Sequence, residues 1–227
     1  MGDRHLLDRP VWSALTTRRA EFATGGPLAH RLSPDMGLFA AAADASQPAL
    51  AALARLVGPG EIVGTVEPAG WPAAPGLTPI RDARCVQMVA DQVPVFEASA
   101  DIVPLNESDA PAMLDLATRT EPGPFRAATH RFGGFVGVKQ GGRLVAMAGR
   151  RLAVPGHVEL SGVCTDPEHR GRGYARILSA HVARAIAAAG DRPFLHAYAG
   201  HGATIALYES LGFRIRTELD YRLFARG

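Results

Sequence analysis

The stretch of this 227-residue chain that most constrains its fold runs from residue 158 to residue 186, VELSGVCTDPEHRGRGYARILSAHVARAI. Its first residues alternate in the manner of a strand, which places three apolar side chains on one face: Val158, Leu160 and Cys164. A basic, glycine-rich loop follows at residues 170–175, and apolar residues then recur at helical spacing as far as Gly190. A strand, a glycine loop and a helix N-terminus in this order gather backbone N–H groups, so the stretch is suited to binding an anion such as a phosphate.

The loop differs from two common phosphate-binding loops. A P-loop requires Gly-x-x-x-x-Gly-Lys-Ser/Thr, a run that this chain lacks. A dinucleotide fingerprint requires Gly-x-Gly-x-x-Gly, and Gly171 and Gly173 supply its first two glycines, but Arg176 stands at the third. Asp191 lies at about the right distance for the ribose-binding acid, yet it follows Gly190, in the turn before the next strand. A dinucleotide site is therefore the weaker interpretation.

A third pattern matches better. Arg170, Gly173 and Ala175 form Arg-x-x-Gly-x-Ala, which resembles the acetyl-CoA-binding motif of the GNAT superfamily of N-acyltransferases. Residues 203–213, ATIALYESLGF, are similar to the superfamily's second motif, a helix with Leu-Tyr followed by Leu-Gly-Phe. The resemblance spans residues 102–224, a little over half of the chain. A glycine loop alone is more often a surface turn, but the two motifs at this separation favour an acyltransferase.

Composition narrows the remaining function classes. Hydrophobic residues make up 47% and charged residues 20% of the chain, as in ordinary globular proteins. The net charge is +2 and the arginines are scattered, which does not favour nucleic-acid binding. The first residues are charged, and no apolar run approaches the thickness of a bilayer. We therefore expect a cytoplasmic protein, a monomer or homodimer, with neither nucleic acid nor membrane as a partner.

Cysteine and histidine usage predicts no metal. Cys85 and Cys164 lie far apart and match no disulfide framework or metal-ligand spacing. The eight histidines form no His-x-x-x-His pair and no His/Cys cluster.

The chain divides into two predicted regions, residues 1–96 and residues 97–227, separated by a linker at 91–96 that contains Pro94. The first region carries no evident catalytic motif and resembles the degenerate first half of glycine-N-acyltransferase-like relatives. Its expected helices cover residues 10–22 and 47–57. Its expected strands cover residues 28–32, 38–42, 61–66 and 84–90.

The second region alternates strands and helices. We expect hairpin turns at Gly141-Gly142 and at Pro155-Gly156, and an irregular connection over residues 120–132. Besides the opening stretch, the expected strands cover residues 102–105, 135–139, 144–152, 194–198, 213–216 and 219–224. One expected helix carries Met113, Leu114, Leu116 and Ala117 after a cap at Asn106 or Ser108, and another covers residues 204–211.

The predicted fold class is α/β. By resemblance to the GNAT superfamily, it is a mixed, strongly twisted sheet flanked by helices and preceded by the degenerate α/β N-terminal half. The resemblance also implies that the sheet is splayed at the strand over residues 159–165, with Gly162 a candidate bulge.

The resemblance implies a set of cofactor-binding residues. The backbone of Val163, Cys164 and Thr165 would bond the pantetheine arm like an added strand, and loop amides would hold the pyrophosphate. His201 stands where many relatives have an asparagine, and an imidazole can donate a similar hydrogen bond. The predicted cofactor site comprises Val163, Cys164, Thr165, Arg170, Gly171, Arg172, Gly173, Tyr174, Ala175 and His201.

Acyl transfer from a thioester to an amine needs a held thioester, a base for the ammonium and a proton for the departing thiolate. Tyr208 occupies the Leu-Tyr position where relatives place a phenol near the thioester sulfur, so it is the predicted general acid. By the same resemblance Glu159 is the predicted base, because it occupies the strand position where many relatives carry one; a partly desolvated carboxylate there could have a raised pKa. A relayed water and a plain Glu–Arg pair remain open alternatives. Cys164 ranks low as a nucleophile because its face of the strand is buried.

The connection at 120–132 falls where relatives shape the acceptor pocket. Its predicted substrate-binding residues are Glu121, which can face an ammonium, Phe125 and Thr129. The predicted function is an acetyl-CoA-dependent N-acyltransferase that moves an acetyl group directly to a primary amine of a small molecule or amino acid in a ternary complex. The alternative is a noncatalytic acyl-CoA-binding sensor, which needs neither Glu159 nor Tyr208.

Overall fold

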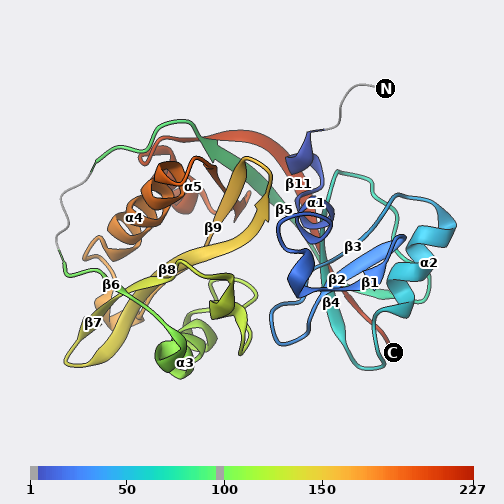
Figure 1. Cartoon of the computed structure of the whole chain (residues 1–227), viewed down its shortest axis with the longest axis horizontal. Coiled ribbons are helices and arrows are strands. Elements are labelled where there is room, and N and C mark those ends of the chain that lie inside the picture. Colours follow the sequence, from blue (N-terminus) through green and yellow to red (C-terminus); the bar gives the residue numbers. More distant parts are fainter. Residues whose placement is uncertain (1–4, 96–99) are drawn as a thin grey trace.

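A computed structural model describes residues 5–95 and 100–227. Within these residues the main feature is an eight-stranded mixed sheet with strand order β4-β11-β5-β10-β9-β8-β7-β6 (Figure 1). A separate antiparallel sheet has the order β1-β2-β3. The strands are β1 (Ala23–Gly26), β2 (Ala29–Leu32), β3 (Ala40–Ala42), β4 (Ile62–Glu67), β5 (Thr78–Ala90), β6 (Val103–Pro104), β7 (Val136–Gln140), β8 (Arg143–Val154), β9 (His157–Thr165), β10 (Arg192–Tyr198) and β11 (Phe213–Ala225).

Helices cover both faces of the large sheet (Figure 1). The helices are α1 (Pro10–Leu15), α2 (Gln47–Arg55), α3 (Ala110–Thr120), α4 (Tyr174–Ala188) and α5 (Gly202–Glu209), with 3-10 turns η1 (Leu6–Asp8), η2 (Ala20–Phe22), η3 (Glu107–Asp109), η4 (Thr129–Phe132) and η5 (Pro167–His169). The core under α4 contains Val86 and Met88 of β5, whereas Cys85 and Val89 of the same strand belong to the core with α1. None of the helices in the described residues combines the length and apolarity needed to span a bilayer. The mixed, helix-flanked sheet confirms the predicted fold class.

The N-terminal region is built into the large sheet. β5 lies between β10 and β11 and is antiparallel to both, with Cys85 opposite Tyr198 on one side and opposite Leu219 on the other. The predicted strand at 84–90 is therefore the second half of a thirteen-residue strand. The boundary between residues 96 and 97 lies outside the described residues, as does the last residue of the predicted linker, but the regions on either side share one sheet.

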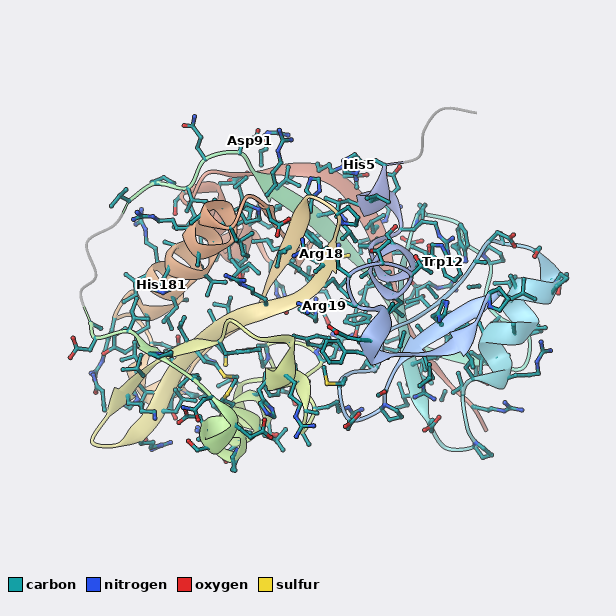
Figure 2. The ribbon with its side chains drawn as sticks, in the orientation of Figure 1. His5, Trp12, Arg18, Arg19, Asp91 and His181 are labelled. Carbon is teal, nitrogen blue, oxygen red and sulfur yellow. The ribbon has the colours of Figure 1, made fainter. Side chains whose placement is uncertain are left out.

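The predicted helix over residues 10–22 is two shorter elements, α1 and η2. Thr16 follows the end of α1, and its hydroxyl donates to the carbonyl of Trp12 at 2.8 Å, which satisfies a helix-end acceptor. Two arginines then join this segment to the rest of the chain (Figure 2). Arg18 Nη1 donates to both carboxylate oxygens of Asp191 at 2.7 and 2.8 Å, and Arg19 Nε donates to the carbonyl of Arg151 at 2.8 Å. The bond from Arg19 holds the segment against β8.

The predicted splay of the sheet is confirmed. The parallel strands β9 and β10 pair only from His157 opposite Arg192 to Glu159 opposite Phe194. Beyond Glu159, β9 continues along β8, with Ser161 opposite Gly149 and Cys164 opposite Met147. Two residues of β9 thus oppose one of β8, which is a bulge, and Gly162 adopts the left-handed φ of +65° there. The far half of β9 is left with an edge that pairs with no strand of the described chain.

The bulge also overturns one expectation about faces. Val158 and Leu160 pack into the core under α4, but Cys164 packs with Met113 and Leu116 of α3 on the other face. An extra residue reverses the alternation of every side chain that follows it, so the three apolar residues do not share a face. Cys164 is nevertheless buried, as expected.

Candidate active site

A cleft of about 490 Å³ lies along the unpaired half of β9, the loop that follows it and the start of α4. All the predicted cofactor-binding residues except His201 line it: Val163, Cys164, Thr165, Arg170, Gly171, Arg172, Gly173, Tyr174 and Ala175. Thr120 at the end of α3 and Leu207 of α5 complete the opposite side. The cleft therefore offers open strand backbone at one end and a basic glycine loop at the other.

The glycine loop owes its shape to left-handed backbone. Gly171 and Gly173 both have φ of +77°, and Gly173 is the N-cap of α4. An added Cβ at either position would meet no protein atom within 4 Å, so these residues are glycines for backbone conformation rather than for packing. The N–H groups of the first turn of α4 have no partner within the helix, and they point out of the N-terminus toward the cleft.

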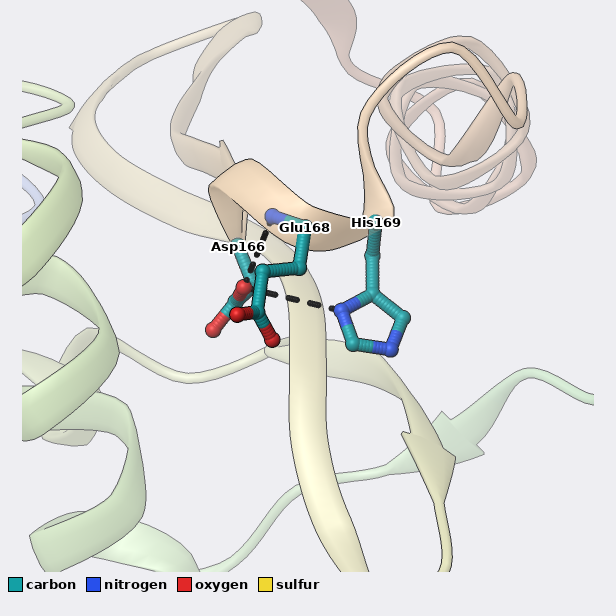
Figure 3. Close-up of side chains that lie close together, drawn as sticks. All are labelled: Asp166, Glu168 and His169. Carbon is teal, nitrogen blue, oxygen red and sulfur yellow. Dashed lines mark hydrogen bonds and ion pairs between the residues drawn. The ribbon is translucent and has the colours of Figure 1, made fainter.

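The turn before the loop is held by Asp166 (Figure 3). Its Oδ1 accepts the N–H of Glu168 at 3.1 Å, and its Oδ2 accepts Arg119 Nη1 at 2.7 Å and Arg143 Nη2 at 2.8 Å. The hydrogen bond from Arg119 is the main reason that the pKa of Asp166 is lowered to about 2. Asp166, Glu168 and His169 lie close enough together to hold an ion. Because two arginines already neutralise Asp166, we assign the cluster to fastening the loop to α3 and β8.

A second pocket, of about 250 Å³, opens where β9 and β10 diverge. Its walls come from both predicted regions of the chain: Phe39, Val66, Cys85, Glu121, Pro122, Gly123, Arg151, Leu152, Val163, His196, Ala197, Tyr198, His201, Thr204, Tyr208 and Tyr221. Val163 lines both the cleft and this pocket. Thr120 lines the cleft and its neighbour Glu121 lines the pocket. Likewise, Leu207 lines the cleft and its neighbour Tyr208 lines the pocket.

Tyr208 lies on α5 with its side chain buried and lining the second pocket. Its ring packs against Phe213 with centroids 5.9 Å apart. Burial raises the pKa of the phenol to about 12, which keeps the hydroxyl protonated across the neutral range. The hydroxyl therefore stays a hydrogen-bond donor beside the junction of cleft and pocket.

Glu159 is fully buried, and its carboxylate is saturated with donors. Oε1 accepts from Arg151 Nη2 at 2.8 Å and from His196 Nδ1 at 2.7 Å. Oε2 accepts from Arg151 Nε at 2.9 Å and from the N–H of Leu152 at 3.1 Å. Burial alone would raise the pKa, but Arg151 and the hydrogen bonds outweigh it and the pKa is lowered. The expected raised pKa is therefore wrong, and the paired-glutamate alternative is the one that the geometry favours.

Residues 135–223 match the model of the family called FR47-like protein. A protein from Novosphingobium aromaticivorans, assigned to the GNAT family of acetyltransferases, is 44% identical with a TM-score of 0.92, covering 99% of this chain and 100% of its own. The chain belongs to the GNAT family of acetyltransferases. A GCN5-related N-acetyltransferase from Kribbella flavida has the same fold at 18% identity and a TM-score of 0.65, covering 95% of this chain and 94% of its own. No curated protein matches closely enough to count as a relative.

Three other predicted residues of this GNAT acetyltransferase lie away from their expected places. His201 is exposed at the start of α5 and lines the second pocket rather than the cleft, with its ring 5.2 Å from that of Tyr198. Phe125 packs against Phe135 with ring centroids 5.7 Å apart and borders a separate small cavity. The buried hydroxyl of Thr129 accepts the N–H of Arg126 at 2.7 Å and donates to the carbonyl of Met36 at 2.8 Å. Phe125 and Thr129 thus shape the wall from outside, while Glu121 lines the pocket.

The second pocket of this GNAT protein also contains side chains that were not predicted from the sequence. The most connected is His196 of β10, whose Nε2 lies 3.1 Å from Gln87 Nε2. Gln87 Oε1 accepts from Arg216 Nη1 at 2.9 Å, and Gln87 Nε2 donates to the carbonyl of Leu7 at 2.8 Å. These two bonds fix which end of the Gln87 amide is the donor, so His196 Nε2 accepts a hydrogen bond from Gln87 Nε2. The available signal was alternation: His196 and Tyr198 share one face of an otherwise apolar strand.

Proposed function

We propose that this GNAT protein transfers an acetyl group from acetyl-CoA to a primary amine of a small molecule or amino acid, in a ternary complex. The observation that carries the proposal is the junction between cleft and pocket. Val163, the pair Thr120–Glu121 and the pair Leu207–Tyr208 each connect the two spaces. A thioester held along β9 in the cleft would reach this junction, and an amine in the pocket would meet it there.

The chain's own groups suit the cofactor. The unpaired backbone of residues 163–165 provides donors and acceptors for the amide-bearing pantetheine arm, as an added strand would use them. Loop N–H groups at the N-terminus of α4 would hold the pyrophosphate, with Arg170 and Arg172 adding positive charge. These amide donors are held in place by the fold before the ligand arrives.

The chemistry is then a direct displacement through a tetrahedral intermediate. The acceptor nitrogen attacks the thioester carbonyl carbon, the C–S bond breaks, and the thiolate takes the proton of the Tyr208 hydroxyl. The proton that the nitrogen loses on forming the amide returns the Tyr208 phenolate to the phenol. The nitrogen must lose its extra proton first. Every oxygen of Glu159 already accepts two hydrogen bonds, so we assign this proton to water in the open pocket. This is the relayed-water alternative, and we favour it over a Glu159 base.

The proposal extends to the setting of the enzyme. It acts as a monomer or homodimer on a small amine in the cytoplasm, without nucleic acid or membrane as a partner. Descent from the glycine-N-acyltransferase-like branch is also part of it, supported by the α/β region that precedes β6 and contributes β4 and β5 to the sheet.

The test has two stages. Acetyl-CoA, and not NAD, should raise the melting temperature of the protein, since a ligand that binds only the folded state stabilises it. Thiol release is then measured with acetyl-CoA and a panel of primary amines. Amine-dependent thiol release supports the enzyme. Acetyl-CoA binding with no thiol release from any amine would support the noncatalytic sensor instead, and stabilisation by NAD would revive the dinucleotide interpretation.

A further inference from the structure

Glu121 has a backbone conformation that its residue type disfavours. Its φ of +48° and ψ of 55° are left-handed, and it is the one non-glycine residue of the described chain with a positive φ. Its N–H donates to the carbonyl of Ala117 at 2.8 Å and closes the C-terminus of α3. Glycine is the usual residue at such a helix end, because it has no Cβ to be strained. A glutamate here costs stability that a glycine would not, so its side chain is the feature to explain.

The carboxylate of Glu121 is available to a ligand. The side chain is exposed and lines the second pocket, one residue from Thr120 in the cleft. Among residues 5–95 and 100–227 its carboxylate makes no hydrogen bond or ion pair. It is therefore an uncommitted negative charge at the junction where the thioester and the amine would meet.

The rest of the pocket lining leaves this charge uncompensated. Arg151, the other charged residue of the lining, is paired with Glu159 at 2.8 Å, and the pair is neutral as a unit. Four aromatic rings form part of the remaining wall, those of Phe39, Tyr198, Tyr208 and Tyr221, with Tyr221 placed 6.0 Å from Tyr198 and 6.3 Å from Phe39, centroid to centroid. A pocket with apolar ring walls and one free carboxylate favours a cation with an apolar body.

We propose that Glu121 binds the ammonium group of the acceptor and selects an arylalkylamine-type acceptor, with an aromatic body and no carboxylate of its own. This inference rests on the proposed function and narrows its substrate class. Alkyl ammonium groups, with a pKa of about 10, are charged at neutral pH, so the cation is the form that arrives. An acceptor carboxylate would lie near Glu121 and find Arg151 already neutralised, so zwitterionic amino acids are disfavoured.

The test uses amines matched with the amino acids from which they differ by one carboxylate: tyramine with tyrosine, tryptamine with tryptophan, and isobutylamine with valine. We measure kcat/KM for each by thiol release. The wild-type protein should favour an aromatic amine over its amino acid by about tenfold or more, and over isobutylamine. Glu121→Gln should lower kcat/KM for that amine about tenfold, chiefly through KM, and leave the amino acid nearly unchanged. The intrinsic reactivity of each acceptor cancels when variants are compared.

A second variant excludes misfolding as the cause. Glu121→Gly removes the carboxylate and relieves the left-handed backbone, so it should lose the same activity with a melting temperature that is unchanged or raised by up to about 4 °C. A preference for amino acids or for isobutylamine, or equal losses with an amine and its amino acid, would overturn the inference while amine-dependent thiol release kept the proposed function. If no amine supported thiol release, both the inference about Glu121 and the proposed acetyltransferase function would be wrong.

Discussion

The cleft and the second pocket differ in what builds them. The cleft is formed largely by one continuous segment, residues 163–176, and it offers backbone groups and scattered arginines. The pocket gathers side chains from β4, β5, β8, β9, β10, α5, β11 and three loops, and it offers a buried ion pair, phenols and an exposed carboxylate. A site made of backbone depends on local conformation, whereas a site made of side chains depends on distant segments meeting. Substitutions in the cleft should therefore affect the affinity for acetyl-CoA. Substitutions in the second pocket should affect stability, turnover or the choice of acceptor.

The largest expected effect tests the ion pair under the pocket. Glu159→Gln leaves Arg151 buried without its counter-charge, so we expect the free energy of unfolding to fall by about 3–5 kcal/mol. Urea denaturation measures the loss. The double variant Arg151→Met/Glu159→Gln removes both charges and should recover much of it. A single variant of wild-type stability with a selective loss of kcat would instead restore Glu159 as the base.

Tyr208→Phe should act on turnover rather than stability. The ring stays in place, and the lost hydroxyl should lower kcat by roughly 10² with KM little changed, because the thiolate then leaves without a proton. A donor with a more acidic leaving thiol should lose less. Tyr221→Phe is the matched control: this phenol is also buried in the pocket and also has a pKa raised to about 12. Equal losses in the two variants would contradict a special role for Tyr208.

Gly173→Val tests the glycine loop of the cleft. Valine tolerates a φ of +77° poorly and adds bulk where the loop N–H groups face the cleft, so affinity for acetyl-CoA should fall about 30-fold, or about 2 kcal/mol. Gly76→Val carries the same backbone cost at φ +80°, in an exposed loop with open space around it. Titration calorimetry of both variants separates the two causes. A similar loss of affinity in both would mean that backbone strain, rather than the cleft, is responsible.

The smallest expected effect is a pH dependence that lies outside both sites. Burial is the main reason that the pKa of His157 and of His5 is lowered from 6.5, with nearby arginines contributing. Above pH 6.5 such a histidine is neutral in both states and does not change the free energy of unfolding. Below pH 6.5 the unfolded chain binds the proton more readily than the folded one, so the free energy of unfolding falls as the pH drops. Melting temperatures from pH 8 to pH 5 measure the slope. His157→Gln should flatten it, and an unchanged slope would show that other groups govern it.

The local features of this chain could be predicted from its sequence. Glycine pairs at Gly141-Gly142 and the Pro155-Gly156 turn form the expected hairpins, joining β7 to β8 and β8 to β9. The loop at 170–175 lies in the cleft with α4 behind it. In each case the conformation depends on residues within one or two turns of each other, and binding through backbone N–H groups follows from that conformation alone.

Tertiary structure decided the rest. One inserted residue at Gly162 moved Cys164 to the α3 face, and no periodicity reveals such a bulge with certainty. The insertion of β5 between β10 and β11 placed Gln87 beside His196, across 109 residues of sequence. Glu159 became an ion-pair partner because Arg151, Leu152 and His196 all meet it where it is fully buried, and a pKa follows from such neighbours rather than from the residue itself. The sequence by itself determined where the cleft along β9 forms, because that cleft is local backbone; which side chains line the second pocket was settled only when distant strands packed together.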